Sequence, residues 1–201
     1  MRHILLNLRL MILVLLTAAT PAWAQVAADA PHFIEERAHT VLALFNNNAL
    51  SPDQREDRLR EIVTASFDVP TISRFVLGRY WATATPAERK DFTRLFEHYQ
   101  VHIYATLFAQ YPDSKVKMKG ERPEANNRTL VRSEIAWRGS QQPAKVDWWV
   151  KKTDDRFKII DVSVDGISQL VTLRDEFSSV IQQHDGQVAG LIEHLKEKTG
   201  G

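Results

Sequence analysis

Two histidines are the first candidates for chemistry in this chain. His98 and His102 lie four residues apart in a segment with helical periodicity, which places both imidazoles on one face of a helix. Such a pair could share a metal ion, but the zinc-protease pattern needs a glutamate directly after the first histidine, where this chain has Tyr99. No third ligand is evident in the sequence. We therefore expect no metal site and interpret the pair as part of a helix surface.

Nucleophilic and phosphate-binding motifs are equally incomplete. The segment Gly166-Ile167-Ser168 lacks the second half of a nucleophile elbow, and no glycine-rich phosphate loop occurs. The 201 residues include no cysteine, which excludes disulfides, thiolate metal ligands and a cysteine nucleophile. We expect a protein that is not an enzyme and that has no cofactor.

An excess of aromatic and aliphatic residues is the more distinctive feature. Tyr80-Trp81 and Trp148-Trp149 are adjacent pairs, and neighbours on a strand face opposite sides of a sheet. Trp148 is expected on the apolar side of the sheet, with Trp149 and Ile159 on its otherwise polar side. These residues could fill an ordinary core. Alternatively, helices and sheet close incompletely and leave an apolar pocket between them.

The first half of the chain has helical periodicity. Two capping boxes with proline at the first helical position, Ser51-Pro52-Asp53-Gln54 and Thr85-Pro86-Ala87-Glu88, predict where helices begin. The helices expected in this half are 31–47, 51–67, 70–78 and 85–110.

The second half changes to an alternating pattern with turn-rich connections, which predicts an antiparallel meander. The expected strands are 129–137, 144–152 and 157–165, with 115–119 as a weaker candidate, and two helices follow at 168–184 and 187–198. The predicted fold class is α+β, with helices packed on one face of a curved antiparallel sheet of three to four strands and an apolar pocket between them.

The N-terminus has the pattern of an export signal. A basic start is followed by an apolar stretch at 10–19 that is too short to span a bilayer comfortably, and Ala22-Trp23-Ala24 resembles a cleavage site. We expect residues 1–24 to be removed near Ala24 and residues 25–201 to form a single domain, soluble in a bacterial periplasm and monomeric.

The charge balance argues against a nucleic-acid partner. The chain has 26 basic and 25 acidic residues, and two of the basic residues, Arg2 and Arg9, belong to the signal. The mature protein therefore lacks the positive charge of a nucleic-acid-binding domain.

Two motifs resemble a known family. The segment 75–81 (FVLGRYW) followed by Thr85-Pro86, and the segment 161–168 (DVSVDGIS) followed by Arg174 and Phe177, are similar to the periplasmic phospholipid-binding proteins of the MlaC type, also called the toluene-tolerance auxiliary family. The resemblance runs from about Phe67 to the C-terminus. It implies a soluble carrier that shuttles a phospholipid between an outer-membrane lipoprotein complex and an inner-membrane ABC transporter and so maintains outer-membrane lipid asymmetry.

A lipid pocket is the site that this resemblance implies. Removing a diacyl lipid from a bilayer exposes roughly thirty methylenes at about 0.8 kcal/mol each, which demands a deep apolar cavity. The residues expected to line it are Val76, Phe96, Tyr99, Ile103, Tyr104, Phe108, Val131, Ile135, Trp148, Val150, Ile160, Val162, Val164, Leu170 and Phe177.

Alternatives remain open at this stage. The family often has tyrosine where Trp148 stands and a Tyr-Arg pair where this chain has Leu173-Arg174. A branch of the family is associated with hopanoid production, and a rigid polycyclic lipid would suit extra tryptophan. Two other hypotheses are an adaptor protein of a membrane complex that carries no cargo and a small hydrolase on the same scaffold.

Overall fold

The structure is a computed structural model that describes residues 22–111, 113–154 and 156–200. The expected signal segment therefore lies almost wholly outside the described residues. The elements, in chain order, are α1 (Ala22–Phe45), α2 (Pro52–Ser66), α3 (Val69–Leu77), α4 (Tyr80–Thr83), α5 (Pro86–Gln110), β1 (Lys115–Glu124), β2 (Arg128–Ala136), β3 (Ala144–Thr153), β4 (Arg156–Val164), β5 (Ile167–Ser168), α6 (Gln169–Gln183) and α7 (Val188–Thr199).

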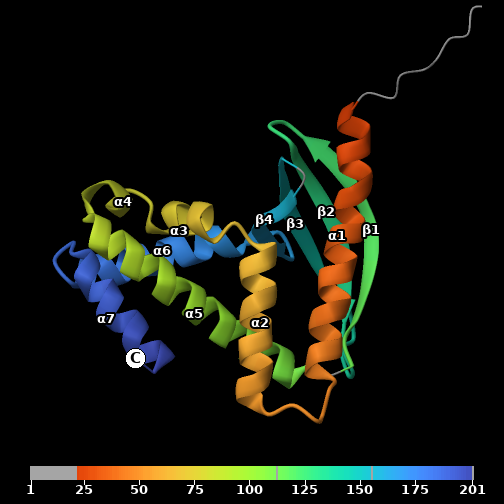
Figure 1. Cartoon of the computed structure of the whole chain (residues 1–201), viewed down its shortest axis with the longest axis horizontal. Coiled ribbons are helices and arrows are strands. Elements are labelled where there is room, and N and C mark those ends of the chain that lie inside the picture. The colour runs from red at the N-terminus through yellow and green to blue at the C-terminus, as the bar shows by residue number, and fades with distance from the viewer. Residues whose placement is uncertain (1–21, 112, 155, 201) are drawn as a thin grey trace, which may run out of the picture.

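The five strands form one antiparallel sheet in the order β1-β2-β3-β4-β5. Figure 1 shows the sheet curving around α1, with the other helices on the same side. The α+β class is confirmed, but within the described residues the sheet has five strands rather than three or four, the fifth being the two-residue β5. The candidate strand at 115–119 continues to Glu124 as an edge strand, whose exposed lysines weakened its sequence signal.

A β-bulge in β4 changes which residues face the helices. Trp148 pairs with Val162 and Trp149 with Asp161, but Val150 pairs with Ile159, so Ile160 is the extra residue. The expectation that Ile159 lies on the polar side is therefore wrong, because Ile159 is buried beside Val150.

The same bulge explains Lys158, which simple alternation would place on the apolar side. Lys158 instead lies across from Lys151. Its ammonium donates to the carbonyls of Thr64 and Ala65, at 3.0 and 2.7 Å. A cation at the C-terminal end of α2 offsets the negative end of the helix dipole, and it ties α2 to the sheet.

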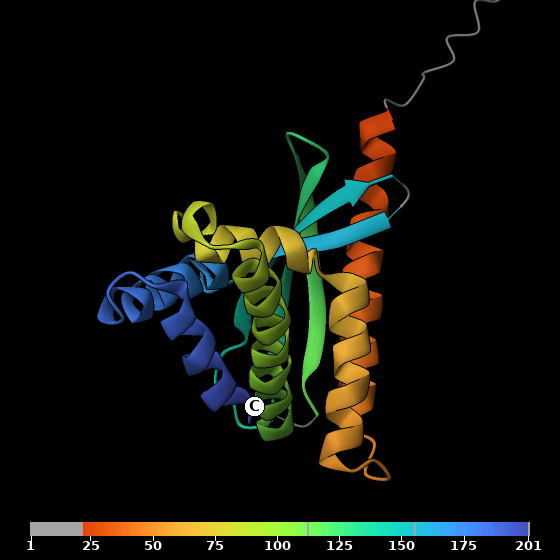
Figure 2. The same ribbon diagram turned by 60° about the vertical axis from the view of Figure 1, so that its left-hand side comes forward.

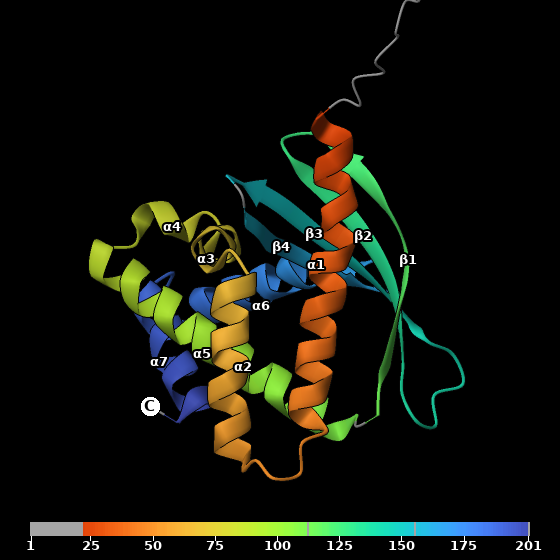
Figure 3. The ribbon, with the colours of Figure 1, turned by 45° about the vertical axis from the view of Figure 1, so that its right-hand side comes forward.

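The first helix lies along the sheet. α1 begins at Ala22 and contains Pro31, so the helix starts before residue 31, where the sequence predicted its start. Ala30 and Ile34 are buried against Val131, Val150 and Ile159 of the sheet. Figure 3 shows α1 in front of the strands and α2 beside it.

The remaining helices form a second core away from the sheet. Phe177 of α6 is buried and makes edge-on contacts with Phe92 and Phe96 of α5 at centroid distances of 6.0 and 6.1 Å, and with Tyr99 at 5.9 Å. Figure 2 shows α3 to α7 gathered to one side of α1 and α2. This helical core holds α5 in place against the rest of the fold.

Phe67, at the end of α2, joins these parts. It packs against the helical core, against the α1–sheet core and against a third cluster formed by α1, α2 and α5. The next residue, Asp68, donates its backbone N–H to the Ile159 carbonyl at 3.0 Å, and its side chain caps α3. The α2–α3 junction is therefore fixed to β4.

The two motifs quoted above are part of this framework. Gly78 ends α3 at a φ of 56°, where a side chain would be strained, and the Arg174 side chain packs over it. Asp161 accepts hydrogen bonds from the Ser168 hydroxyl at 2.7 Å and from the Leu170 N–H at 3.4 Å, which fixes the start of α6. These residues stabilise turns and helix ends.

The two histidines contact α2. His98 Nε2 lies 2.8 Å from an Arg60 guanidinium nitrogen, and His102 Nδ1 lies 3.7 Å from a Glu56 carboxylate oxygen. Burial, and then the positive charge of Arg60, lower the pKa of His98 below its ordinary value. This pair forms a polar contact between α2 and α5.

We expect His98 to make the protein less stable in mild acid. Because its folded-state pKa is lowered, its contribution to stability is present above the unfolded pKa of about 6.5 and is lost as the pH falls below it. Thermal unfolding midpoints measured from pH 7.5 to 5 should fall more steeply for the natural protein than for His98→Gln. Equal dependence of the unfolding midpoint on pH in the natural protein and His98→Gln would contradict this role. His39→Gln serves as a control, because His39 is a histidine on another helix.

Candidate functional site

An apolar cavity of about 380 Å³ lies between the sheet and the helices α1, α2 and α5. Its volume is in the range of pockets that bind small organic ligands. Its lining residues are Ile34, Arg37, Ala38, Val41, Leu42, Leu59, Ile62, Val63, Ser66, Phe67, Tyr104, Leu107, Phe108, Tyr111, Ser114, Val116, Ile135, Trp137, Ala144, Val146, Trp148, Ile159, Val162, Val164 and Gln169.

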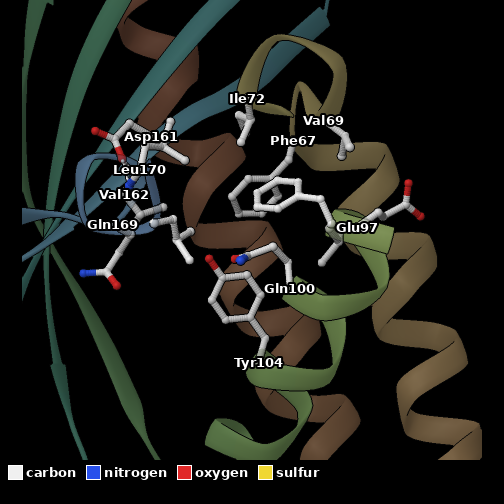
Figure 4. Close-up of a pocket in the computed structure, with 13 residues that line it drawn as sticks. Phe67, Val69, Ile72, Glu97, Gln100, Tyr104, Asp161, Val162, Gln169 and Leu170 are labelled. Atoms are coloured by element: carbon white, nitrogen blue, oxygen red, sulfur yellow. Dashed lines mark hydrogen bonds between the residues drawn. The ribbon is translucent and has the colours of Figure 1, made fainter. Parts of the chain in front are cut away.

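A smaller pocket of about 30 Å³ adjoins the cavity. Figure 4 shows Phe67 and Tyr104 facing one another in it, with Val162 and Gln169 on the opposite wall. The two rings are stacked with centroids 6.4 Å apart. Five residues line both spaces and so form the partition between them, namely Val63, Phe67, Tyr104, Val162 and Gln169.

The Trp148 indole in the sheet wall of the cavity is hydrogen-bonded within the protein. The Trp148 indole N–H donates to the Ser133 hydroxyl at 2.9 Å, and that hydroxyl donates to the Val146 carbonyl at 3.2 Å. Burial, with a smaller effect of the Asp161 charge, raises the pKa of Tyr104 to about 12, so its phenol stays neutral at physiological pH. Trp148 from the sheet and Tyr104 from α5 therefore both present neutral groups to a largely hydrocarbon cavity.

The structure brings together part of the expected site. Six of the expected residues line the large cavity, namely Tyr104, Phe108, Ile135, Trp148, Val162 and Val164. Phe96 and Leu170 line the small pocket, where Tyr104 and Val162 also lie.

The other expected residues lie elsewhere. Val131 and Val150 are buried between α1 and the sheet, while Val76, Phe177 and Tyr99 belong to the helical core. Ile103 is 42% exposed on α5, and Ile160 is the half-buried bulge residue that lines neither space.

Sequence reasoning missed the wall that α1 and α2 contribute. Ile34 and Val41 of α1 and Leu59, Ile62 and Val63 of α2 line the cavity. Their apolar spacing predicts helices, but periodicity does not say whether a helix covers the sheet closely or stands away from it. Trp137 and Ala144, on either side of the β2–β3 connection, also line the cavity and were not among the expected residues.

Two further findings concern what the site can do. Within residues 22–111, 113–154 and 156–200, no group of three or more histidine, cysteine, aspartate or glutamate side chains is placed to hold a metal ion. None of the helices in the same ranges is long and apolar enough to cross a membrane.

A curved antiparallel sheet and helices that enclose an apolar cavity define an α+β protein with a nonpolar internal space. The chain belongs to the MlaC family, whose family model (MlaC protein) matches residues 35–197. The toluene tolerance protein ttg2D of Pseudomonas putida is 23% identical over 188 residues, which cover 90% of this chain and 86% of that protein. The expected family is thereby confirmed.

The fold also has a solved counterpart. A phospholipid-binding protein from Ralstonia solanacearum, determined in complex with a phospholipid, matches with a TM-score of 0.74 at 24% identity. The match covers 86% of this chain and 97% of the Ralstonia chain. The arrangement of helices and sheet is therefore shared between the two proteins.

Proposed function

We propose that this protein is a periplasmic lipid carrier that holds the acyl chains of a phospholipid in the cavity between α1, α2, α5 and the sheet. The apolar cavity is the observation that carries the proposal. Each methylene transferred from water into such a space contributes about 0.8 kcal/mol, so a carrier needs extensive apolar contact to hold a lipid outside a membrane.

Membership of the MlaC family supports the proposal, as does the phospholipid in the Ralstonia protein of the same fold. The proposed route leads between an outer-membrane lipoprotein complex and an inner-membrane ABC transporter, where the carrier would maintain outer-membrane lipid asymmetry. The basic and apolar N-terminal sequence supports export to the periplasm, with cleavage near Ala24.

Native mass spectrometry of residues 25–201, purified from a bacterial periplasm without detergent, tests the carrier. The expected result is a phospholipid bound in stoichiometric amount and identified after extraction. A bound hopanoid instead of a phospholipid would support the carrier function but with a different cargo. A protein that stays bare even after incubation with phospholipid vesicles would contradict the proposal and favour an adaptor without cargo.

A further inference from the structure

The outer face of the sheet, which points away from α1 and the cavity, is strongly basic across β1, β2 and β3. On the inner face, Val131 of β2 and Phe157 of β4 pack with α1. Glu121 and Lys152 lie across from these two residues and so belong to the inner face. The other charged residues of the three strands lie on the outer face, where eight are basic and three are acidic. Six of the basic residues make no ion pair with a carboxylate of the described chain, namely Lys115, Lys117, Arg128, Arg132, Lys145 and Lys151.

The acidic residues of the outer face neutralise little of this charge. Lys119 Nζ lies 3.1 Å from a Glu134 carboxylate oxygen, and Arg122 Nε lies 2.7 Å from one of Glu124. The third acidic residue is Asp147. All three acidic residues are half-buried, whereas six of the eight basic residues are exposed. A partner that approaches this face therefore meets cations first.

Charge is divided unevenly over the mature chain. Without Arg2 and Arg9 of the expected export signal, the chain has 24 basic and 25 acidic residues. Apart from the eight basic and three acidic residues of the outer face, 16 basic and 22 acidic residues remain. A protein with charge divided in this way is oriented near a charged surface, because one side is attracted and the other is repelled. The outer face is the side that turns toward an anionic surface.

Trp149 lies in the middle of the outer face. It is across from Leu130 of β2 and Asp161 of β4, and the Arg128 guanidinium carbon lies 5.9 Å from the centre of its ring. The residue is half-buried, so part of it remains in contact with solvent. Tryptophan is enriched at membrane–water interfaces, because its ring is apolar and its N–H is polar. A tryptophan among cations suits the headgroup region of a membrane.

The form of the outer face favours a broad partner over a narrow one. None of the six basic residues without an ion pair lines the cavity or the small pocket. The edge strand β1 has lysines at alternate positions, which discourages another chain from pairing with it as an additional strand. Basic charge spread over three strands fits a surface of many anionic headgroups, which attracts lysine and arginine without a defined pocket.

We propose that the outer face of β1, β2 and β3 docks on the surface of a membrane that contains anionic phospholipids. Each basic residue held near such a surface raises the affinity about fivefold. The inference goes beyond the carrier proposal, because it concerns residues outside the cavity. It adds direct contact with a bilayer to the proposed route between two membrane complexes.

Flotation with vesicles tests this docking on the whole mature chain, residues 25–201. One set of vesicles is phosphatidylcholine alone, and the other is an equal mixture of phosphatidylcholine and phosphatidylglycerol. The natural protein should bind the mixed vesicles, and added salt should weaken that binding. The variant Lys117→Gln, Arg132→Gln, Lys145→Gln should bind the mixed vesicles about 100-fold more weakly, because it lacks three of the cations.

The matched control removes the same charge from the helices. Arg58, Lys90 and Lys198 are exposed residues of α2, α5 and α7. Their combined replacement by glutamine should change the affinity less than about threefold, because salt screens charges that lie away from the membrane. Thermal unfolding shows that both variants are folded. Quantified lipid extracts should show the natural amount of bound phospholipid in both, since none of the six replaced residues lines the cavity.

The outcomes separate this inference from the carrier. A natural protein that binds neither set of vesicles, or binds both equally, overturns the docking, and its own bound phospholipid still supports the carrier. Equal loss of binding in the two variants also overturns the outer face as the docking site. A natural protein that ignores vesicles but binds soluble polyglutamate through the same three cations replaces the membrane by an acidic protein segment. Binding to mixed vesicles by a protein that never carries lipid contradicts the carrier and supports the docking.

Discussion

Replacing Val164 by glutamate is expected to remove bound lipid while the protein stays folded. Val164 is the last residue of β4, and its half-buried side chain lines the cavity. A carboxylate there either keeps water in the cavity or loses its hydration, and removing a charge from water costs several kcal/mol. Since 1.4 kcal/mol corresponds to a factor of ten, retention of phospholipid should fall at least about tenfold. Quantified lipid extracts of the natural and variant proteins measure this.

The matched control is Val171→Glu. Val171 lies on α6, is 49% exposed and lines neither the cavity nor the small pocket. This variant should retain lipid at the natural level. A Val164→Glu protein with a natural circular-dichroism spectrum and undiminished lipid would falsify the placement of the acyl chains in the cavity.

The second large effect is expected on stability. Phe177→Ala removes the ring that contacts Phe92, Phe96 and Tyr99 in the helical core. Truncating a buried phenylalanine costs about 3–5 kcal/mol, because the lost burial adds to the cost of the hole that remains. Chemical denaturation should show this decrease in the free energy of unfolding.

Lipid retention by the folded fraction of Phe177→Ala should be unchanged, because Phe177 lines neither the cavity nor the small pocket. A Phe177→Ala protein that is as stable as the natural protein but has lost its lipid would contradict the roles we assign to the helical core and the cavity. Together the Val164 and Phe177 variants separate binding from stability in the same domain.

Much of the fold could be predicted because its signals are local. The two capping boxes occur where the sequence placed them, at Ser51 and Thr85, and each has both of its reciprocal hydrogen bonds. Alternation gave β2 and β3 to within about two residues, a normal uncertainty for element boundaries. The resemblance in residues 75–81 and 161–168 identified the family, although the structure shows those residues fixing turns and helix ends.

The site was harder to predict, since it depends on how elements are spaced. One bulge residue in β4 exchanges Ile159 for Ile160 on the cavity side, and no residue type marks that shift. Val76 and Phe177 look like any cavity-lining side chains in sequence, but they lie in the helical core.

In the proposed carrier, the cavity also couples cargo to the melting temperature of the protein. Atoms that line an unfilled apolar space lack dispersion contacts on one side, so an occupant adds contacts that the unfolded chain cannot offer. A ligand that binds only the folded state adds about 2.7 kcal/mol to the free energy of unfolding when its free concentration is a hundred times its dissociation constant. A calorimetric scan therefore also measures how much of the protein carries lipid. Delivery of the lipid to an acceptor membrane would lower the transition temperature.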